Sequence, residues 1–423
     1  MLQKPRGTTD ILPGESEAWQ ETEAILRKTA SLYGFSEVRI PTFEVSELYQ
    51  RGVGETSDVV QKEMYTFVDN DRRSMTLRPE GTAGVVRCVI ENGLTGGALP
   101  LALSYFVTCF RYEKPESGRF REFSQFGVEL FGADAPVADA NVILLGRDLF
   151  RNLGIRHISL EINSIGCKAC RPLYREALHT YFSPYQNQLC DTCLGRLETN
   201  PLRIVDCKSE LCSQFAKDAP RTIDHLCPDC HAHFEAVKAC LDAAGVEYTV
   251  NPRIVRGLDY YQRTVFEFIS THEAFRSTLC GGGRYDGLVE ELGGPAVSGV
   301  GFATGINRLI LAMKAEGNLL PVSPSPLLYI AALGPDAQKY AFSLAAYLRE
   351  KEIFAAFDQT GRSLKAQMKY ADKKNAAFTL IVGDGELEKG EAFIKNMETG
   401  VQTPVNLKDF AAIVTAIGKE ANR

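Results

Sequence analysis

The stretch YFVTCFRYEKPESGRFREFSQFGVELFG, residues 105–132, predicts two antiparallel strands joined by a turn that contains proline, serine and glycine. On the returning strand, one face carries the apolar side chains of Phe126, Val128 and Leu130. The opposite face carries Gln125, Gly127 and Glu129. A polar face interrupted by glycine is typical of a sheet with room for a ligand, and the simpler alternative is a surface hairpin with one wet face.

Two later segments add cationic side chains in similar settings. RGLDYYQRTVFEF (residues 256–268) begins with an arginine ahead of a β-branched and aromatic strand, and VSGVGFATGINRLILAM (residues 297–313) runs from glycines into an apolar helix. Neither contains the Gly-Lys-Ser/Thr ending of a P-loop. Guanidinium groups hold phosphate oxygens well. We therefore expect a polyphosphate bound by Arg111, Arg256 and Arg308.

The composition describes an ordinary globular protein. The chain has 423 residues, 45% of them hydrophobic and 24% charged, which is too long for one core and predicts two or three domains. Its net charge of −6 means that a nucleic-acid partner must contact local basic patches. No segment is apolar and long enough for a membrane, and no signal peptide precedes the first motif, so we expect a cytoplasmic location.

The region from about residue 165 to 250 carries eight of the twelve cysteines ahead of Cys240. They form three CxxC pairs and one CxxxxC pair, namely Cys167/Cys170, Cys190/Cys193, Cys207/Cys212 and Cys227/Cys230. Disulfides are disfavoured in the cytoplasm, and this spacing suits tetrahedral zinc, so we predict at least one structural zinc ion. The eight cysteines provide enough ligands for two such sites.

Two alternatives remain open for these cysteines. Nearby histidines could replace a thiolate, namely His225, His231 and His233, or a lost site could have left the cysteines vestigial or merely buried. The other four cysteines are interpreted as core residues: Cys88, Cys109, Cys240 and Cys280.

Several segments resemble known family motifs. Residues 105–132 resemble motif 2 of the class II aminoacyl-tRNA synthetases, GVGFATGINRL resembles motif 3, and GFSEVRIPTFEVSELY resembles motif 1 with its proline at Pro41. KPRGTTDILP, LRPEGTA, RGLDYYQRTVFEF and GGGRYDGL resemble signatures of the histidyl-tRNA synthetase family. The resemblance extends in the expected order from residue 4 to about residue 400.

The resemblance implies an α+β fold. A class II antiparallel-sheet catalytic core would occupy residues 1–320, with a cysteine-rich, mostly helical insertion at about 165–250 that reaches towards the tRNA acceptor stem. An α/β anticodon-binding domain would follow at 327–423. The implied activity is ATP-dependent activation of L-histidine, with Mg²⁺ on the phosphates, followed by transfer to tRNA(His). Motif 1 implies a homodimer, with Pro41 packed across the two-fold axis.

Roles for individual residues also follow from the resemblance. Catalysis is assigned to Arg256 and Arg111, and ATP binding to Arg111, Glu113 and Arg308. Histidine binding is assigned to Glu80, Gly81, Thr82, Arg111, Gln125, Glu129, Arg256, Tyr260, Tyr261 and Tyr285. The chain departs from the family pattern at Ser124, where histidine is usual, at Asn307, where an acid is usual, and at Glu116, where glutamine is common.

Residues 317–326, rich in proline and serine, predict a linker, and the strand–helix alternation beyond it predicts a small α/β domain with a largely parallel sheet. The spacing of Arg362, Lys365, Lys369 and Lys373 predicts one basic helix face, which is either solvated or in contact with a tRNA backbone.

Two other functions are compatible with parts of the pattern. A regulatory paralogue, the synthetase-like subunit of ATP phosphoribosyltransferase, usually lacks the C-terminal domain and the arginine of RGLDYY, and both are present here. A zinc-dependent nucleic-acid-binding protein would leave the ordered arginine and glycine motifs unexplained. Turnover of ATP separates an enzyme from either.

Overall fold

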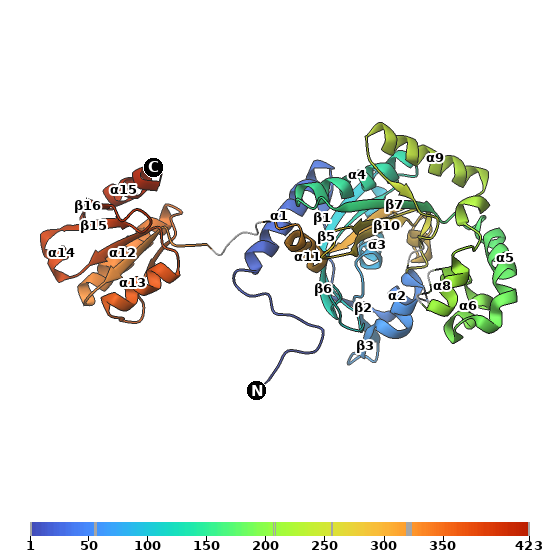
Figure 1. Cartoon of the computed structure of the whole chain (residues 1–423), viewed down its shortest axis with the longest axis horizontal. Helices are drawn as coiled ribbons and strands as arrows, with labels where there is room; N and C mark the ends of the chain where they lie inside the picture. The colour runs from blue at the N-terminus through green and yellow to red at the C-terminus, as the bar shows by residue number, and fades with distance from the viewer. Residues whose placement is uncertain are drawn as a thin grey trace. The chain divides into compact units, whose positions relative to one another are not determined.

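The computed structural model describes residues 2–54, 57–205, 207, 209–254, 257–318 and 324–421. Arg256 therefore lies outside the described residues. The chain forms two compact units, Met1–Pro321 and Val322–Arg423, which are both drawn in Figure 1. Among the helices that the structure describes, none is both long and apolar enough to cross a bilayer.

The first unit is built on an eight-stranded sheet with the order β1-β5-β6-β11-β10-β9-β7-β8. The strands are β1 Ser36–Glu37, β5 Leu101–Phe110, β6 Glu122–Phe131, β7 Ile158–Ser164, β8 Thr249–Val250, β9 Gln262–Ser270, β10 Ser277–Arg284 and β11 Gly299–Gly305. All neighbours are antiparallel except the two edge pairs, β1–β5 and β7–β8. The predicted antiparallel-sheet core is confirmed.

One face of this sheet packs against the main hydrophobic core. Phe126, Val128 and Leu130 of β6 belong to it, as the alternation in the sequence predicts. The core also receives apolar side chains from α1 (Ser16–Leu32), α4 (Pro136–Asn152), α9 (Pro228–Ala243) and α11 (Ile306–Ala315). Figure 1 shows α4 and α9 together on one side of the sheet. The opposite face, with Gln125 and Glu129, is thus left for the site.

That opposite face carries a second core and a small sheet. α3 (Thr82–Glu91) and α10 (Leu288–Glu291) pack there with Tyr105 and Tyr285. A three-stranded sheet has the order β2-β4-β3, formed by Phe43–Val45, Ser74–Leu77 and Tyr65–Val68. Between β2 and β3 the chain forms α2 (Ser46–Val53) and a π-helix at Val59–Glu63.

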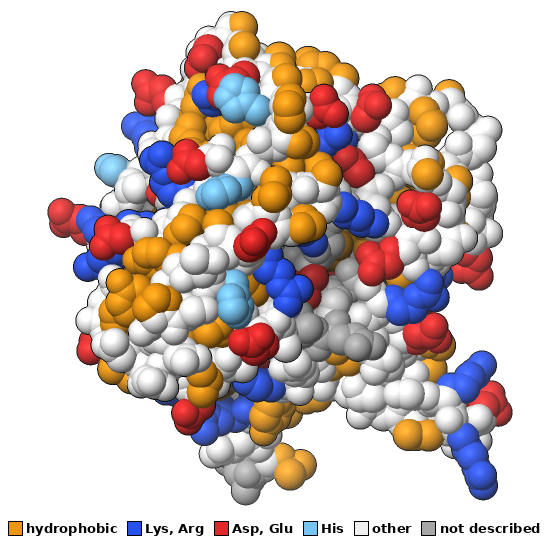
Figure 2. Space-filling view, turned by 90° about the vertical axis from the view of Figure 1, so that its right-hand side faces the viewer, with side chains coloured by type: hydrophobic (Ala, Val, Ile, Leu, Met, Phe, Trp, Pro, Cys, Tyr) orange, Lys and Arg blue, Asp and Glu red, His pale blue; other side chains and the backbone are white. Residues whose placement is uncertain are grey.

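The insertion leaves the sheet after β7 and returns through α9 to β8. Its helices are α5 Arg171–Phe182, α6 Asp191–Thr199, α7 Leu202–Val205 and α8 Glu210–Ala216, and it also contains 3₁₀ turns at Ser183–Gln188 and Thr222–His225. Another 3₁₀ turn, Leu94–Gly96, precedes β5. Tyr174, Leu178, Phe182 and Leu197 form its own small core. Figure 2 shows this side of the unit, where acidic and basic side chains are interspersed with apolar ones.

The second unit has a five-stranded sheet with the order β13-β12-β14-β15-β16. Its elements are β12 Leu328–Ala332, α12 Pro335–Glu350, β13 Ala355–Phe357, α13 Leu364–Lys373, β14 Phe378–Val382, α14 Asp384–Lys389, β15 Glu391–Asn396, β16 Gln402–Asn406 and α15 Phe410–Ala421. β12 is parallel to β13 and β14, but β14–β15 and β15–β16 are antiparallel. The expectation of a parallel sheet is confirmed for β12, β13 and β14, the strands of the predicted alternation. It is wrong for β15 and β16, because the connections at residues 383–390 and 397–401 are too short for a parallel crossover.

The predicted basic helix face needs a correction. Arg362 precedes Ser363, the N-cap of α13, and so lies outside the helix. Its guanidinium donates to Asp358 at 2.7 Å and lies 4.2 Å from the ring centroid of Tyr370. Lys365, Lys369 and Lys373 are on α13 and exposed, so the helix itself carries a shorter basic stripe.

Candidate active site

The glycines of the sheet make room for protein side chains. Tyr105 on β5 lies opposite Gly127 on β6. A Cβ atom on Gly127 would come within 2.2 Å of the Tyr105 ring, and one on Gly81 would do the same. The interpretation that Gly127 leaves space for a ligand is therefore wrong, because the Tyr105 ring fills that space. Sequence reasoning missed Tyr105, although its place across from a glycine is a usable signal.

Glu129 lies at the buried end of the same polar face. Only 1% of it is exposed, and its carboxyl accepts hydrogen bonds from Tyr105 Oη at 3.0 Å and from Tyr285 Oη. A Cβ atom on Gly301 would come within 2.0 Å of Glu129 Oε2, so glycine is required there. Desolvation by burial raises the pKa of Glu129 to about 8, which makes its charge sensitive to pH near neutrality.

A cavity of about 180 Å³ opens above this face between β6, β10, β11 and the segment before β9. Most of the residues expected at the site line it, namely Glu80, Thr82, Arg111, Glu113, Gln125, Tyr260, Tyr261 and Arg308. Three others do not line it. Gly81 lies under the Tyr105 ring, and Glu129 and Tyr285 are hydrogen-bonded to each other among buried residues. These three therefore lie directly behind the cavity wall.

Three guanidinium groups make the cavity cationic. Arg111 Nε donates to Pro79 O at 2.8 Å, and Arg308 donates to Gly118 O at 2.9 Å and Thr278 O at 2.7 Å. Arg119, which sequence reasoning missed, also lines the cavity. Burial, and then the charge of Arg119, lower the pKa of Arg308. An anion in the cavity would relieve this repulsion, so the site suits a phosphate-bearing ligand.

Glu80 is tied to the start of α3. Its two carboxylate oxygens accept the backbone N–H groups of Thr82 and Ala83, each at 2.8 Å. Desolvation raises the pKa of this buried carboxyl, while those hydrogen bonds work in the opposite direction. Two N–H donors orient the carboxylate and leave it lone pairs for a further donor.

The departures at residues 124 and 307 meet in space. Asn307 Oδ1 accepts a hydrogen bond from the backbone N–H of Ser124 at 3.0 Å. Because an acid at residue 307 would offer the same acceptor, asparagine keeps this link between α11 and the second strand of the hairpin. Glu116, the third departure, pairs with Arg119 at 3.0 Å within the turn of the hairpin.

The interpretation of four cysteines as core residues holds in part. Cys109 and Cys280 are buried, whereas Cys88 and Cys240 are half-buried. Cys280 also lines the cavity, together with Thr278, Leu279 and Gly281 of the same strand, none of which was expected at the site.

The other eight cysteines gather into two clusters. The outer cluster is Cys167, Cys170, Cys227 and Cys230, and the inner cluster is Cys190, Cys193, Cys207 and Cys212. Within each, the four Sγ atoms lie within 4.8 Å of one another. Zn–S bonds of about 2.3 Å in a tetrahedron place sulfurs roughly 3.8 Å apart. The separations of 3.7 Å for Cys167–Cys170 and 3.9 Å for Cys167–Cys227 and Cys190–Cys207 fit that geometry.

Backbone N–H groups also favour thiolates in both clusters. The N–H of Cys227 donates to Cys170 Sγ at 3.1 Å, and that of Cys190 donates to Cys212 Sγ at 3.3 Å. Burial still raises the pKa of both thiols, and these hydrogen bonds oppose that rise. Although desolvation opposes it, backbone hydrogen bonds from Cys170 and Ala169 lower the pKa of Cys167 to about 7. The nearby histidines are outside both clusters: His233 bonds to Asp139, and His225 lies beside Tyr174.

An antiparallel sheet with an arginine-bearing hairpin and a glycine-rich strand running into α11 defines a class II aminoacyl-tRNA synthetase. The profile described as Histidyl-tRNA synthetase matches residues 7–170 and 213–309, and the one described as Anticodon binding domain matches residues 328–417. The chain belongs to the histidyl-tRNA synthetase family. The match to the first profile passes over residues 171–212, which include the inner cluster.

Individual relatives agree over nearly the whole chain. A protein named Histidine--tRNA ligase from Desulforamulus reducens is 48% identical over 98% of this chain and 99% of its own. One of the same name from Caldicellulosiruptor bescii is 50% identical over 96% and 97%. The crystal structure of apo S. aureus histidyl-tRNA synthetase is 40% identical, with a TM-score of 0.84 over 99% of this chain and 100% of that chain.

Proposed function

We propose that this chain is a histidine–tRNA ligase, which activates L-histidine with ATP and transfers it to tRNA(His). The observation that carries the proposal is the cavity in which Arg111, Arg119 and Arg308 converge in front of the Glu129–Tyr285 pair. The first feature suits the phosphates of ATP, and the second suits an imidazole. Membership of the family and the matched anticodon-binding domain support the same activity.

The reaction proceeds in two steps. The carboxylate of histidine attacks the α-phosphorus of ATP, a new O–P bond forms, and pyrophosphate leaves. A ribose hydroxyl at the 3′ end of the tRNA then attacks the carbonyl carbon, and AMP leaves with the former carboxylate oxygen. The first step is an in-line displacement between negatively charged groups, so the protein contributes chiefly orientation and neutralisation of charge.

Each arginine is assigned to a different part of the triphosphate. Arg111 contacts the α-phosphate, and Arg308 the far end of the triphosphate. The carbonyl groups that accept from Arg111 and Arg308 hold both guanidinium groups in place before ATP arrives. Mg²⁺, when bound with ATP, would supply further neutralisation of the phosphate charge. Glu113, also in the cavity wall, belongs to the ATP subsite. Arg256, which lies outside the described residues, is assigned to the space between the histidine carboxylate and the α-phosphate.

Specificity rests on matching both ends of histidine. Glu80 and Thr82, with the backbone at Gly81, bind the α-amino group at the start of α3. Gln125, Glu129, Tyr260, Tyr261 and Tyr285 surround the imidazole. Glu129 and Tyr261 are assigned to the ring nitrogens. A competing amino acid would leave these buried polar groups unpaired, and this penalty supplies strong discrimination.

The two cysteine clusters bind structural zinc. Their sulfur separations, their burial and the N–H donors to Cys170 and Cys212 support one all-thiolate tetrahedral site in each. Zinc there would cross-link segments of the insertion that share only a small apolar core.

The partners follow from the activity. tRNA(His) contacts the anticodon-binding unit, where the exposed lysines of α13 are candidates for backbone contacts. The small sheet, whose edge strand β2 lies in motif 1, mediates a homodimer, and the exposed residues Pro41 and Phe43 support this. Charging of tRNA for translation places the protein in the cytoplasm.

The test is histidine-dependent ATP–pyrophosphate exchange on the purified protein, with the variant Arg256→Ala alongside. We expect exchange that requires histidine and falls by at least about 100-fold in the variant, as for the loss of one preorganised charge contact. Binding of histidine without exchange would contradict the proposal and favour the regulatory paralogue.

A further inference from the structure

We infer that the outer cluster, occupied by zinc, is a clamp that positions the histidine pocket through Arg171. The inference rests on the proposed function, because it concerns the affinity for histidine. It assigns Arg171 as a positioning residue, and it gives the outer and inner clusters different tasks. Three observations support the inference. The cluster is joined to the sheet, α9 is held in a fixed position, and Arg171 forms a hydrogen bond to the pocket.

The outer cluster is joined directly to the strand that leaves the pocket. β7 and β9 pair as far as Ser164 and Thr264. Two hydrogen bonds continue this pairing into the loop that leads to Cys167 and Cys170. They run from Ile165 N–H to Arg263 O at 2.9 Å and from Arg263 N–H to Gly166 O at 2.8 Å. Gly166 has φ +67°, and a Cβ atom there would come within 2.6 Å of the Cβ of Cys170. The cysteine loop therefore starts next to Arg263, two residues after Tyr261.

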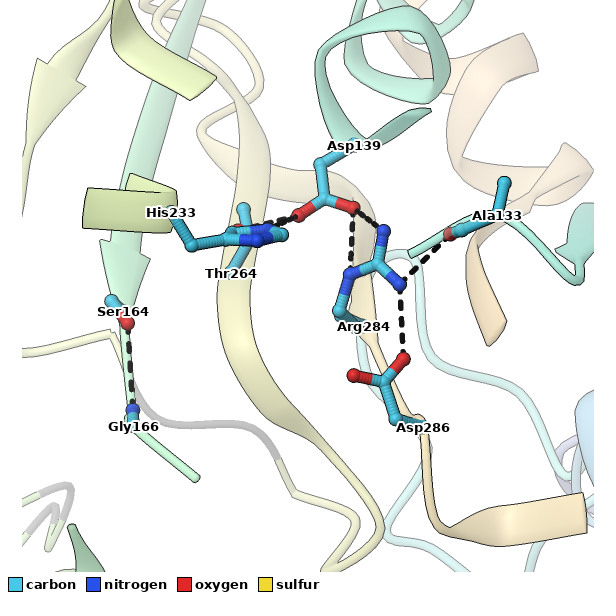
Figure 3. A network of polar contacts seen from close by, with 8 residues as sticks. All are labelled: Ala133, Asp139, Ser164, Gly166, His233, Thr264, Arg284 and Asp286. Carbon is cyan, nitrogen blue, oxygen red and sulfur yellow. Dashed lines mark hydrogen bonds and ion pairs between the residues drawn. The ribbon is translucent and has the colours of Figure 1, made fainter. Parts of the chain in front are cut away.

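The α9 side of the cluster is held by a buried ionic network, shown in Figure 3. His233, three residues after Cys230, donates to Asp139 at 2.7 Å. Asp139 also accepts from Thr264 Oγ1 at 2.7 Å and from Arg284 Nε at 2.8 Å. Both Asp139 and Arg284 are fully buried. This network ties α9 to α4, β9 and β10, so Cys227 and Cys230 sit on a fixed support.

The α5 side of the cluster leads to the pocket. Cys170 is the N-cap of α5, and Arg171 is its first residue. The Arg171 guanidinium donates to the backbone carbonyl of Tyr261, a residue of the cavity wall. Its Nε is buried without a hydrogen-bond partner, so this guanidinium is desolvated to reach the carbonyl. Zinc would transfer the fixed position of α9 through Cys170 to Arg171, and from there to Tyr261.

The consequence is specific to histidine. Without zinc, the start of α5 keeps the hydrogen bond from Cys227 N–H to Cys170 Sγ but loses its metal–ligand bonds to α9, so the donor to the carbonyl of Tyr261 is less firmly oriented. The Tyr261 ring then samples positions that do not fit the ligand, which weakens binding of histidine. The arginines of the ATP subsite are held by Pro79, Gly118 and Thr278, none of which belongs to the insertion, and they keep their places.

The experiment measures KM for histidine and for ATP by pyrophosphate exchange in the full-length protein, with zinc content determined alongside. Arg171→Ala should keep two zinc ions, raise the KM for histidine about tenfold, and leave the KM for ATP near the wild-type value. Arg171→Lys, which can still donate to a carbonyl, should recover part of the loss. Arg175→Ala is the matched control, since Arg175 lies one turn further along α5 and donates to Glu198 O within the insertion.

Removal of zinc by a chelator completes the test and does not depend on a cysteine variant that fails to fold. Chelation should raise the KM for histidine in the wild type but hardly further in Arg171→Ala, because both changes break one chain of contacts. An unchanged KM for histidine in Arg171→Ala, or an equal response to chelation in both proteins, overturns the clamp. Absence of any exchange in the zinc-loaded wild type instead overturns the proposed function.

Discussion

The carboxyl of Glu129 links burial to a measurable pH dependence. Burial raises its pKa from an ordinary 4.5 to about 8, so in the free protein it holds a proton below that pH. A protonated carboxyl accepts an imidazole N–H more weakly than the carboxylate does, because it lacks the negative charge. The folded state also holds a proton between about pH 4.5 and pH 8 that the unfolded chain has lost. Glu129 therefore lowers the free energy of unfolding as the pH rises through that range.

We predict that kcat/KM for histidine rises with pH up to about 8, by about tenfold per unit, and then levels off. Glu129→Gln should lower kcat/KM and abolish this limb. Ionisation of free histidine affects both proteins equally, so comparison of the two profiles isolates the carboxyl. A limb that persists unchanged in the variant would assign the ionisation to another group.

At the scale of the helices and strands, the insertion has few buried apolar side chains to stabilise its fold. Its core is small, and its helices α6, α7 and α8 are short. Isolated helices of such length are unstable in water, so other cross-links must hold them. The zinc proposed for the inner cluster would supply them, because Cys190 and Cys193 lie at the start of α6, and Cys207 and Cys212 lie on either side of the start of α8.

We predict two zinc ions per chain, and one in Cys212→Ser, measured by elemental analysis of protein purified without added metal. The variant should lose helical circular dichroism and become sensitive to protease within residues 171–212. Its KM for histidine should rise less than that of a variant in the outer cluster. Retention of both zinc ions would contradict the assignment of the inner site.

For the chain as a whole, the small sheet is the surface to which the proposed homodimer is assigned. Phe43 and Val45 on β2 and Phe67 on β3 flank Met75 and Leu77 of β4 on one face. Phe43 is 51% exposed and Phe67 is 43% exposed, with ring centroids 6.1 Å apart. The other face carries Thr66, Thr76 and Ser74 with exposed Val68, and Ser46 is bonded to Thr76 at 2.6 Å. An apolar sheet face open to solvent is typical of an interface, and its edge strand β2 lies in motif 1.

We predict that Phe67→Asp shifts the protein from dimer to monomer in analytical ultracentrifugation. Because the side chain is largely exposed in the single chain, the thermal stability of the monomeric fold should change little. Lys62→Asp serves as the control, since this exposed charge lies outside the small sheet. A wild type that sediments as a monomer would exclude this interface.

Local patterning accounts for the features that were predicted correctly. The alternation of residues 125–130 assigns each side chain of β6 to a face, because strand geometry depends only on neighbouring residues. Motif order placed Arg111 and Arg308 at the cavity, and the cysteine spacing predicted paired ligands. The roles of the site residues stay predictions, including that of Arg256, which lies outside the described residues.

Long-range contacts produced the rest. Cys167 and Cys170 join Cys227 and Cys230, about 60 residues away, rather than the pair that follows them, since the loop after β7 and the start of α9 lie side by side. Spacing along the chain cannot encode that choice. Tyr105 fills the space above Gly127, and Asp139 neutralises Arg284, because strands and helices distant in sequence bring these groups into contact. Local sequence thus specifies the secondary structure and the chemical groups, whereas the tertiary fold determines which of those groups come into contact.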